Sequence, residues 1–134
     1  MILRTWFQEV WNKGSEAAID ELLSPDVQIH NLLDSDGEKI SGIQSFKKMF
    51  RAFRSAFSEI NVTVEHELTQ GNMSAAHCII TGVHSGEGLG RVPHNHPIYF
   101  TGMCMVQVQD GKIIESWNYF DFETIAGCHW LRAP

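Results

Sequence analysis

The sequence contains no long apolar run, and no stretch approaches the roughly 18 apolar residues that a membrane-spanning helix needs. Its first residues, Met1 to Trp6, also lack the basic segment and apolar run of a secretory signal peptide. These absences predict a protein that does not associate with a membrane. We therefore expect a cytoplasmic location.

Cysteine is scarce as well. Cys78, Cys104 and Cys128 form an odd set without a C-x-x-C spacing, which argues against a disulfide framework and against a structural zinc site. So few cysteines suit a reducing compartment. Because Cys104 falls in the middle of an expected strand, it is predicted to be a small buried side chain and not a nucleophile.

Positive charge is the third thing in short supply. Lysine and arginine number 10 against 16 aspartates and glutamates, which gives a net charge of −6. A basic surface for nucleic acid or for an anionic membrane is therefore not expected. The only basic cluster recurs at helical spacing and is interpreted as the solvated face of a helix: Lys47, Lys48, Arg51 and Arg54.

The chain is nevertheless well supplied with apolar residues. Hydrophobic side chains make up 43 % of its 134 residues, which predicts one domain over 1–134 with a substantial core. Apolar spacing of three and four predicts helices over 3–11, 15–23 and 41–57, with a short strand over 27–31 between the second and the third. Ser15 is expected to cap the second helix, and Ser41 and Gln44 to form a capping box on the third.

After Ser58 the apolar period changes to two. Four strands are predicted, over 60–68, 73–83, 98–109 and 112–121, with turns at Gln70-Gly71-Asn72 and Asp110-Gly111. Early helices followed by hairpin-linked strands predict an α+β fold. The late strands carry apolar residues on both faces, so helices should cover one face and a second copy of the chain the other. We therefore expect a homodimer through the sheet.

The last of these strands carries the main candidate for chemistry. Trp117, Tyr119 and Asp121 point to one side of it, because side chains alternate along a strand. A carboxylate at the end of an aromatic row is costly to bury without a partner. Burial there would raise the pKa of an aspartate and make it a better base at neutral pH. The alternative is an ordinary solvated strand end.

Further candidate residues surround this strand. Met49 and Phe53 belong to the buried stripe of the third helix, which is either plain core or the wall of a cavity. His30, at the end of the first strand, could bind a substrate carbonyl or orient Asp121, or it could be a partly exposed strand-end histidine. His77 could donate to a substrate oxygen or be a satisfied core histidine.

A metal site and a cofactor site are not expected. His84, His94 and His96 lie in or beside one loop, but His94-Asn95-His96-Pro97 lacks a nearby glutamate, and loop histidines bind a metal only when the backbone brings them together. The glycines at 86, 88 and 90 precede neither a lysine nor a helix, so they do not form a phosphate loop and are expected to shape the mouth of a pocket.

The element order resembles that of the nuclear-transport-factor-2-like (NTF2-like) superfamily. Within it, the chain is similar to the SnoaL-like polyketide cyclase and ester cyclase family over about Trp6 to Asp121. The segments that carry the resemblance are Val10-Trp11-Asn12-Lys13-Gly14, Pro25-Asp26-Val27-Gln28-Ile29-His30-Asn31, Thr81-Gly82-Val83-His84-Ser85-Gly86, and Asp110-Gly111-Lys112-Ile113-Ile114-Glu115-Ser116-Trp117.

The resemblance implies a cone-shaped half-barrel, in which a curved, mostly antiparallel sheet wraps around three helices and leaves an apolar pocket. It also implies an aspartate in the pocket, here Asp121, as general acid/base of a cyclase or isomerase that needs neither metal nor cofactor. The substrate would be a small apolar carbonyl compound. We predict catalytic roles for Asp121, His30 and His77, and substrate contacts for Trp117, Tyr119, Phe53, Met49 and His84.

The chain also departs from other members of the superfamily. Phe7 and Asn31 fall where ketosteroid isomerases carry a tyrosine and an aspartate, and neither residue ionises, so that type of proton transfer is disfavoured. No pocket-facing arginine is expected to complete an epoxide-hydrolase set. Two other functions remain open: a non-catalytic binder of a small ligand, and an interaction dimer with an incidental cavity.

Overall fold

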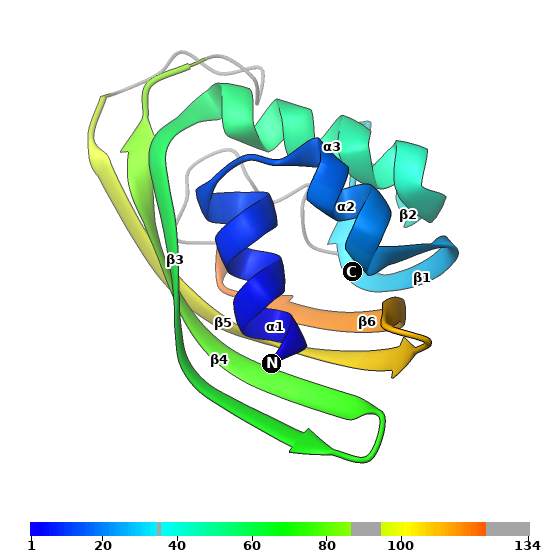
Figure 1. Ribbon diagram of the computed structural model, residues 1–134. Coiled ribbons are helices and arrows are strands. Elements are labelled where there is room, and N and C mark those ends of the chain that lie inside the picture. Colours follow the sequence, from blue (N-terminus) through cyan, green and yellow to red (C-terminus); the bar gives the residue numbers. More distant parts are fainter. Residues whose placement is uncertain (35, 87–94, 123–134) are drawn as a thin grey trace.

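The computed structural model describes residues 1–34, 36–86 and 95–122 and shows a curved sheet with helices packed in its concave face (Figure 1). The helical elements are α1 Ile2–Trp6, η1 Phe7–Asn12, α2 Glu16–Leu22 and α3 Gly42–Ala56. The strands are β1 Leu23–Leu33, β2 Lys39–Ser41, β3 Phe57–Gln70, β4 Met73–His84, β5 Pro97–Gln109 and β6 Lys112–Phe120. The expected α+β class is confirmed. The sequence also predicts a short helix or an irregular cover over 122–134, and beyond Phe122 this segment lies outside the described residues.

The first expected helix is present but changes its winding. α1 continues directly into the π-helix η1, and the N–H of Lys13 donates to the carbonyl of Gln8 five residues earlier (3.0 Å). Gly14 ends this segment with a φ of 73°, in the left-handed region that glycine adopts without strain. Ser15 then caps α2, because its Oγ accepts from the N–H of Ala18 (3.1 Å), as predicted.

The start of α3 corrects a local prediction. Ser41 is the N-cap, but its side chain makes no capping hydrogen bond. Instead, Oγ of Ser45 accepts from the N–H of Ser41 (2.8 Å), and Gln44 is exposed, so the predicted capping box is wrong. The polar, glycine-containing segment 32–39 is predicted from the sequence to be a loop. This prediction is partly wrong, because β1 extends to Leu33 and β2 begins at Lys39 and pairs with β1.

The six strands form one sheet in the order β2-β1-β6-β5-β4-β3. The four late strands are antiparallel neighbours, as predicted. β1 joins them by lying parallel to β6, with His30 opposite Trp117, so the sheet is mixed. Asp110 and Gly111 both have positive φ (54° and 78°), which is the geometry of the tight hairpin turn that their sequence predicts.

A β-bulge in β3 changes which side chains face the core. The register against β4 shifts between Val64 and His66. Beyond this shift Leu68 points to the outer face and is 76 % exposed, although uninterrupted alternation would place it beside Ile60. The bulge also brings Glu67 to the start of α1, where its carboxylate accepts from the N–H groups of Leu3 and Arg4 (3.1 and 3.2 Å).

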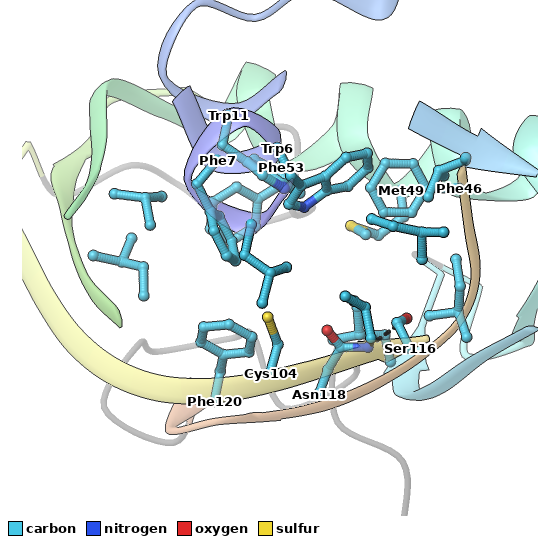
Figure 2. A pocket seen from close by; sticks show the side chains of 18 of the residues that line it. Trp6, Phe7, Trp11, Phe46, Met49, Phe53, Cys104, Ser116, Asn118 and Phe120 are labelled. Carbon is cyan, nitrogen blue, oxygen red and sulfur yellow. Dashed lines mark hydrogen bonds between the residues drawn. The ribbon is translucent and has the colours of Figure 1, made fainter. Parts of the chain in front are cut away.

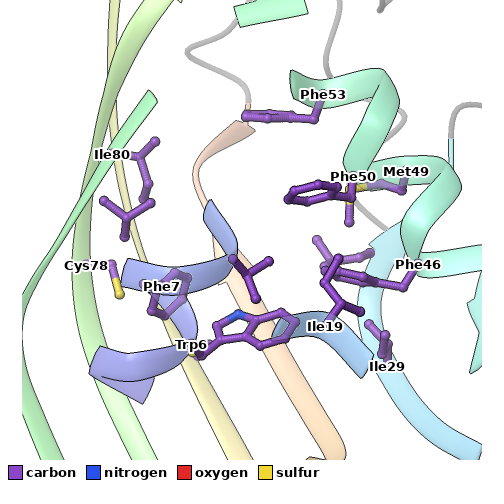
Figure 3. Packing of buried hydrophobic residues seen from close by; sticks show 14 of the residues in the cluster. Trp6, Phe7, Ile19, Ile29, Phe46, Met49, Phe50, Phe53, Cys78 and Ile80 are labelled. Atoms are coloured by element: carbon purple, nitrogen blue, oxygen red, sulfur yellow. The ribbon is translucent and has the colours of Figure 1, made fainter. Parts of the chain in front are cut away.

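The core lies between α3, the amino-terminal helices and the inner face of the sheet (Figure 3). The predicted stripe is buried, and four of its residues lie on α3: Phe46, Met49, Phe50 and Phe53. Its fifth residue, Phe57, is the first residue of β3 and is buried as well. Trp11 packs edge-on against Phe50 and Phe53, with ring centroids 5.0 and 5.5 Å apart. None of the helices in the described ranges is long and apolar enough to cross a bilayer.

Candidate functional site

A cavity of about 90 Å³ lies between the helices and the inner face of the sheet (Figure 2). The helices contribute mainly aromatic side chains to its wall: Trp6, Phe7, Trp11, Phe46, Met49 and Phe53. The sheet contributes mainly aliphatic and small side chains, among them Ile29, Ile80, Phe100, Cys104, Val106, Ile113, Ser116, Asn118 and Phe120. Apolar walls of this kind are typical of sites for small molecules.

Two of the predicted substrate-binding residues lie on this wall. Met49 and Phe53 project from α3 and are buried, and both line the cavity. The two interpretations of the α3 stripe, core and cavity wall, therefore both hold at these positions. Contact of either side chain with a substrate stays a prediction.

The strand β6 turns toward the cavity the face opposite to the one that carries Trp117, Tyr119 and Asp121, which the sequence had suggested would face inward. Ser116, Asn118 and Phe120 line the cavity, whereas Tyr119, 63 % exposed, and Asp121 point to the outside. The cause is a second β-bulge, since the register between β5 and β6 shifts between Glu115 and Ile113. Uninterrupted alternation from Ile113, which lines the cavity, would have turned Trp117, Tyr119 and Asp121 inward.

Asp121 sits at the edge of the site. Its backbone N–H donates to the carbonyl of Thr101 on β5 (3.0 Å), which holds it against the sheet. Its neighbours in sequence, Phe120 and Phe122, both line the cavity, while the residue itself is exposed. The structure therefore places Asp121 beside the cavity and not among the described residues that line it. Its catalytic role stays a prediction, with a different geometry from the one expected.

The three histidines with predicted catalytic or substrate-binding roles, His30, His77 and His84, do not converge on the cavity. His30 lies beside Glu115, with Nε2 2.6 Å from Oε2, and stacks on Trp117 at 5.5 Å between ring centroids. His77 pairs with Glu65 (3.2 Å) on the outer side of β4. His84 is buried on the inner side, 5.2 Å from the ring of Phe57, but is not part of the cavity wall.

The polar pair of the cavity was not anticipated. Nδ2 of Asn118 donates to Oγ of Ser116 (3.1 Å) and to the backbone carbonyl of His30 (3.0 Å). Figure 2 shows both side chains next to each other on β6, facing the aromatic residues of the helices. In the sequence, the only sign of this pair is that two polar residues alternate with Trp117 and Tyr119. This pattern is equally typical of the solvated face of a strand.

The described residues of the wall include no carboxylate and no imidazole. Their only titratable side chain is Cys104, and burial, with the neighbouring Cys78 thiol adding to it, raises the pKa of its thiol far above the ordinary value. The thiol therefore stays protonated at neutral pH, in keeping with the predicted buried role. Within 1–34, 36–86 and 95–122, no three potential metal ligands lie together; His94 falls outside these ranges.

Comparison with solved structures identifies proteins of the same architecture. IdmH from Streptomyces antibioticus, named as a candidate polyketide cyclase, is 26 % identical with a TM-score of 0.76, over 90 % of this chain and 91 % of its own. A candidate SnoaL-like polyketide cyclase from Jannaschia sp. CCS1 is 20 % identical with a TM-score of 0.80, over 99 % and 90 %. A candidate polyketide cyclase from Bacillus cereus is 25 % identical with a TM-score of 0.75, over 95 % and 77 %.

No curated protein sequence matches the chain. The family model described as SnoaL-like polyketide cyclase, however, matches residues 1–126, which is nearly the whole sequence and includes every element that builds the cavity. The curved sheet, the helices in its concave face and the apolar cavity between them agree with that match. The chain belongs to the SnoaL-like polyketide cyclase family.

Proposed function

We propose that the chain is a cofactor-independent cyclase or isomerase that acts on a small, apolar, carbonyl-containing substrate held in the cavity. The observation that carries the proposal is the wall itself, which is apolar except for one hydrogen-bonded polar pair, Ser116 and Asn118. The family match and the names of IdmH and the other cyclase relatives support a cyclase or isomerase.

The cavity would promote ring closure through its shape. Aromatic side chains from α3 and η1 face the sheet across a narrow space, so a flexible substrate that enters must fold. Binding of the substrate holds its two reacting ends together, which lowers the entropic part of the barrier to ring closure. Well-oriented reactions within one molecule gain on the order of several kcal/mol in this way.

The proton transfer is assigned to Asp121. Its carboxylate would take an α-proton from the substrate, the resulting enolate would attack a second carbonyl of the same molecule, and the proton would return to the new alkoxide. Because Asp121 is exposed at the edge of the cavity, this step requires the reacting carbon to lie beside Phe120 and Phe122, not deep in the cavity. General acid–base catalysis contributes roughly two to four powers of ten in rate.

A second function, ligand binding without chemistry, is favoured by one specific observation. Among the described residues that line the cavity, the only titratable group is a thiol whose pKa is raised by burial. A site built to store or carry an apolar molecule needs no more than this. The two functions differ in whether proton transfer accompanies binding.

The deciding experiment measures exchange of the α-protons of phenylacetone, a small apolar ketone, in deuterated water by NMR. The proposal expects exchange with the native protein and a loss of about a hundredfold in Asp121→Asn. Asp110→Asn, at the opposite end of β6, is the matched control, because asparagine tolerates the positive φ of that turn. Binding of phenylacetone without exchange would favour the second function, and exchange that survives in Asp121→Asn would remove Asp121 from the mechanism.

A further inference from the structure

The side chains of Ser116 and Asn118 form a hydrogen-bonded chain whose direction is fixed. The backbone carbonyl of His30 can only accept a hydrogen bond, so the group of Asn118 that lies 3.0 Å from it must be the amide nitrogen, Nδ2. The same nitrogen lies 3.1 Å from Oγ of Ser116 and donates its second hydrogen there. Both hydrogens of the Asn118 amide are thereby used.

The conformation of β1 explains why the backbone carbonyl of His30 accepts a hydrogen bond from a side chain. Parallel pairing of β1 with β6 ends at His30 and Trp117, and the next residue, Asn31, has a φ of 68°. This left-handed conformation turns the strand, and the amide of Asn118 occupies the place beside it. On the outer face of the sheet, the ring of His30 contacts Glu115 and stacks on Trp117, and these contacts help to fix the position of His30.

The consequence concerns the hydroxyl proton of Ser116. A hydroxyl that accepts a hydrogen bond keeps its own proton available as a donor. Among the residues that the structure describes, none accepts this proton, and Ser116 lines the cavity. Donation into its oxygen by Asn118 also polarises the O–H bond and strengthens the hydrogen bond that it can give.

We propose that Ser116 is a binding residue that donates its hydroxyl proton to a carbonyl oxygen of the substrate remote from the carbon that Asp121 deprotonates, and that Asn118 is the positioning residue that sets the direction of this hydrogen bond. The inference rests on the proposed function and deepens it, since it selects the substrate class. A molecule must carry an acceptor oxygen at the β6 side of the cavity and apolar groups toward the helices. A hydrocarbon of the same shape would leave the Ser116 hydroxyl without an acceptor among the apolar side chains of the wall, which is unfavourable.

A pair of probes with nearly the same shape tests the inference without turnover. Acetophenone carries a carbonyl oxygen where α-methylstyrene carries a methylene group. The dissociation constants of both are measured by protein-detected NMR titration for the native protein and for Ser116→Ala. We expect Ser116→Ala to lower the ratio of acetophenone affinity to α-methylstyrene affinity by about fivefold or more, since the lost hydrogen bond affects one probe only.

Two further variants separate this role from a structural one. Ile80→Val removes a wall atom from β4, two strands away from the polar pair on β6, so it should change both affinities alike and leave their ratio unchanged. Asn118→Ala should lower the ratio by less than Ser116→Ala, because the hydroxyl stays but loses its fixed direction. An equal ratio in the native protein, Ser116→Ala and Ile80→Val would overturn the inference.

A spectroscopic measurement covers the case in which Ser116→Ala does not fold. The carbonyl resonance of acetophenone labelled with carbon-13 moves downfield when its oxygen accepts a hydrogen bond. In the native protein it should lie downfield of its position in an alkane solvent, and an alkane-like position would refute the inference by itself. If the affinities of the native protein for acetophenone and α-methylstyrene differ only as much as the hydrophobicities of the two probes, only this inference fails. If the native protein binds neither probe, the proposed function fails as well.

Discussion

Gly102 and Phe120 lie directly opposite each other on β5 and β6, and a Cβ at Gly102 would stand 2.2 Å from Cδ1 of the Phe120 ring. The ring therefore lies over the glycine backbone, in space that any other residue would occupy. Phe120 is also part of the cavity wall. The absence of a side chain at Gly102 thus sets the position of one wall of the site.

We predict that Gly102→Ala pushes the Phe120 ring into the cavity. The free energy of unfolding should fall by about 1–3 kcal/mol, as overpacking typically does, and acetophenone should bind more weakly. Urea denaturation and NMR titration measure the two effects. Phe120→Leu in the same chain should restore much of the stability, because the pair is coupled. Losses that simply add in the double variant would show that the ring does not depend on Gly102.

Asn12 joins the amino-terminal helices to the sheet through both atoms of its amide. Oδ1 accepts from the N–H of Val62 (2.6 Å), and Nδ2 donates to the carbonyl of the same residue (3.0 Å). Asn12→Ala leaves both partners on β3 without these bonds and should lower the free energy of unfolding by about 1–3 kcal/mol in urea denaturation. Asn61→Ala, an exposed change on the same strand, should cost less than about 0.5 kcal/mol. Equal effects of the two variants would contradict the bridging role.

The stability of the protein should fall in alkaline solution through a buried thiol. Burial raises the pKa of Cys78 from 9.0 to about 12, and the nearby Glu67 carboxylate adds to the shift. Above the lower value the unfolded chain releases this proton while the folded chain retains it, so the free energy of unfolding decreases as the pH rises through this window. In urea denaturation over a pH series, Cys78→Ala should show a shallower decrease than the native chain. Parallel curves would refute the assignment.

The fold could be predicted because its signals are local and repeated. Apolar spacing of three and four marked the helices, Ser15 marked the cap of α2, and Asp110-Gly111 marked the last hairpin, all of which the structure contains. The π-helix could not be predicted, because its apolar spacing is close to that of an α-helix. The parallel neighbour of β6 was also missed, since it joins segments more than 80 residues apart, as His30 and Asn118 show.

The candidate site was harder to predict because it depends on β-bulges. A single extra residue between Ile113 and Glu115 exchanges the inner and outer faces of β6, and nothing in the local sequence marks it. Helical spacing alone placed Met49 and Phe53 on the buried side of α3, but it did not decide between plain core and the wall of a cavity. The polar pair on β6 could not, because its meaning depends on the backbone carbonyl of His30 on another strand.

The outer face of the sheet carries large apolar side chains that water does not favour. Met103 and Tyr119 lie opposite each other on β5 and β6 and are 51 % and 63 % exposed. Leu68, Tyr99 and Met105 are exposed on the same sheet. Clusters of this kind mark interaction surfaces, and a second copy of the chain is the predicted cover.

We predict that Met103→Lys converts a homodimer into a monomer, because two copies of the new charge would be buried at a symmetric interface. Light scattering after size-exclusion chromatography at micromolar concentration measures the mass. Gln44→Lys, on the exposed face of α3, adds the same charge away from the sheet and should leave the dimer intact. Circular dichroism should show that both variants remain folded, since neither side chain belongs to the core. A native chain that is monomeric under these conditions would exclude the predicted assembly.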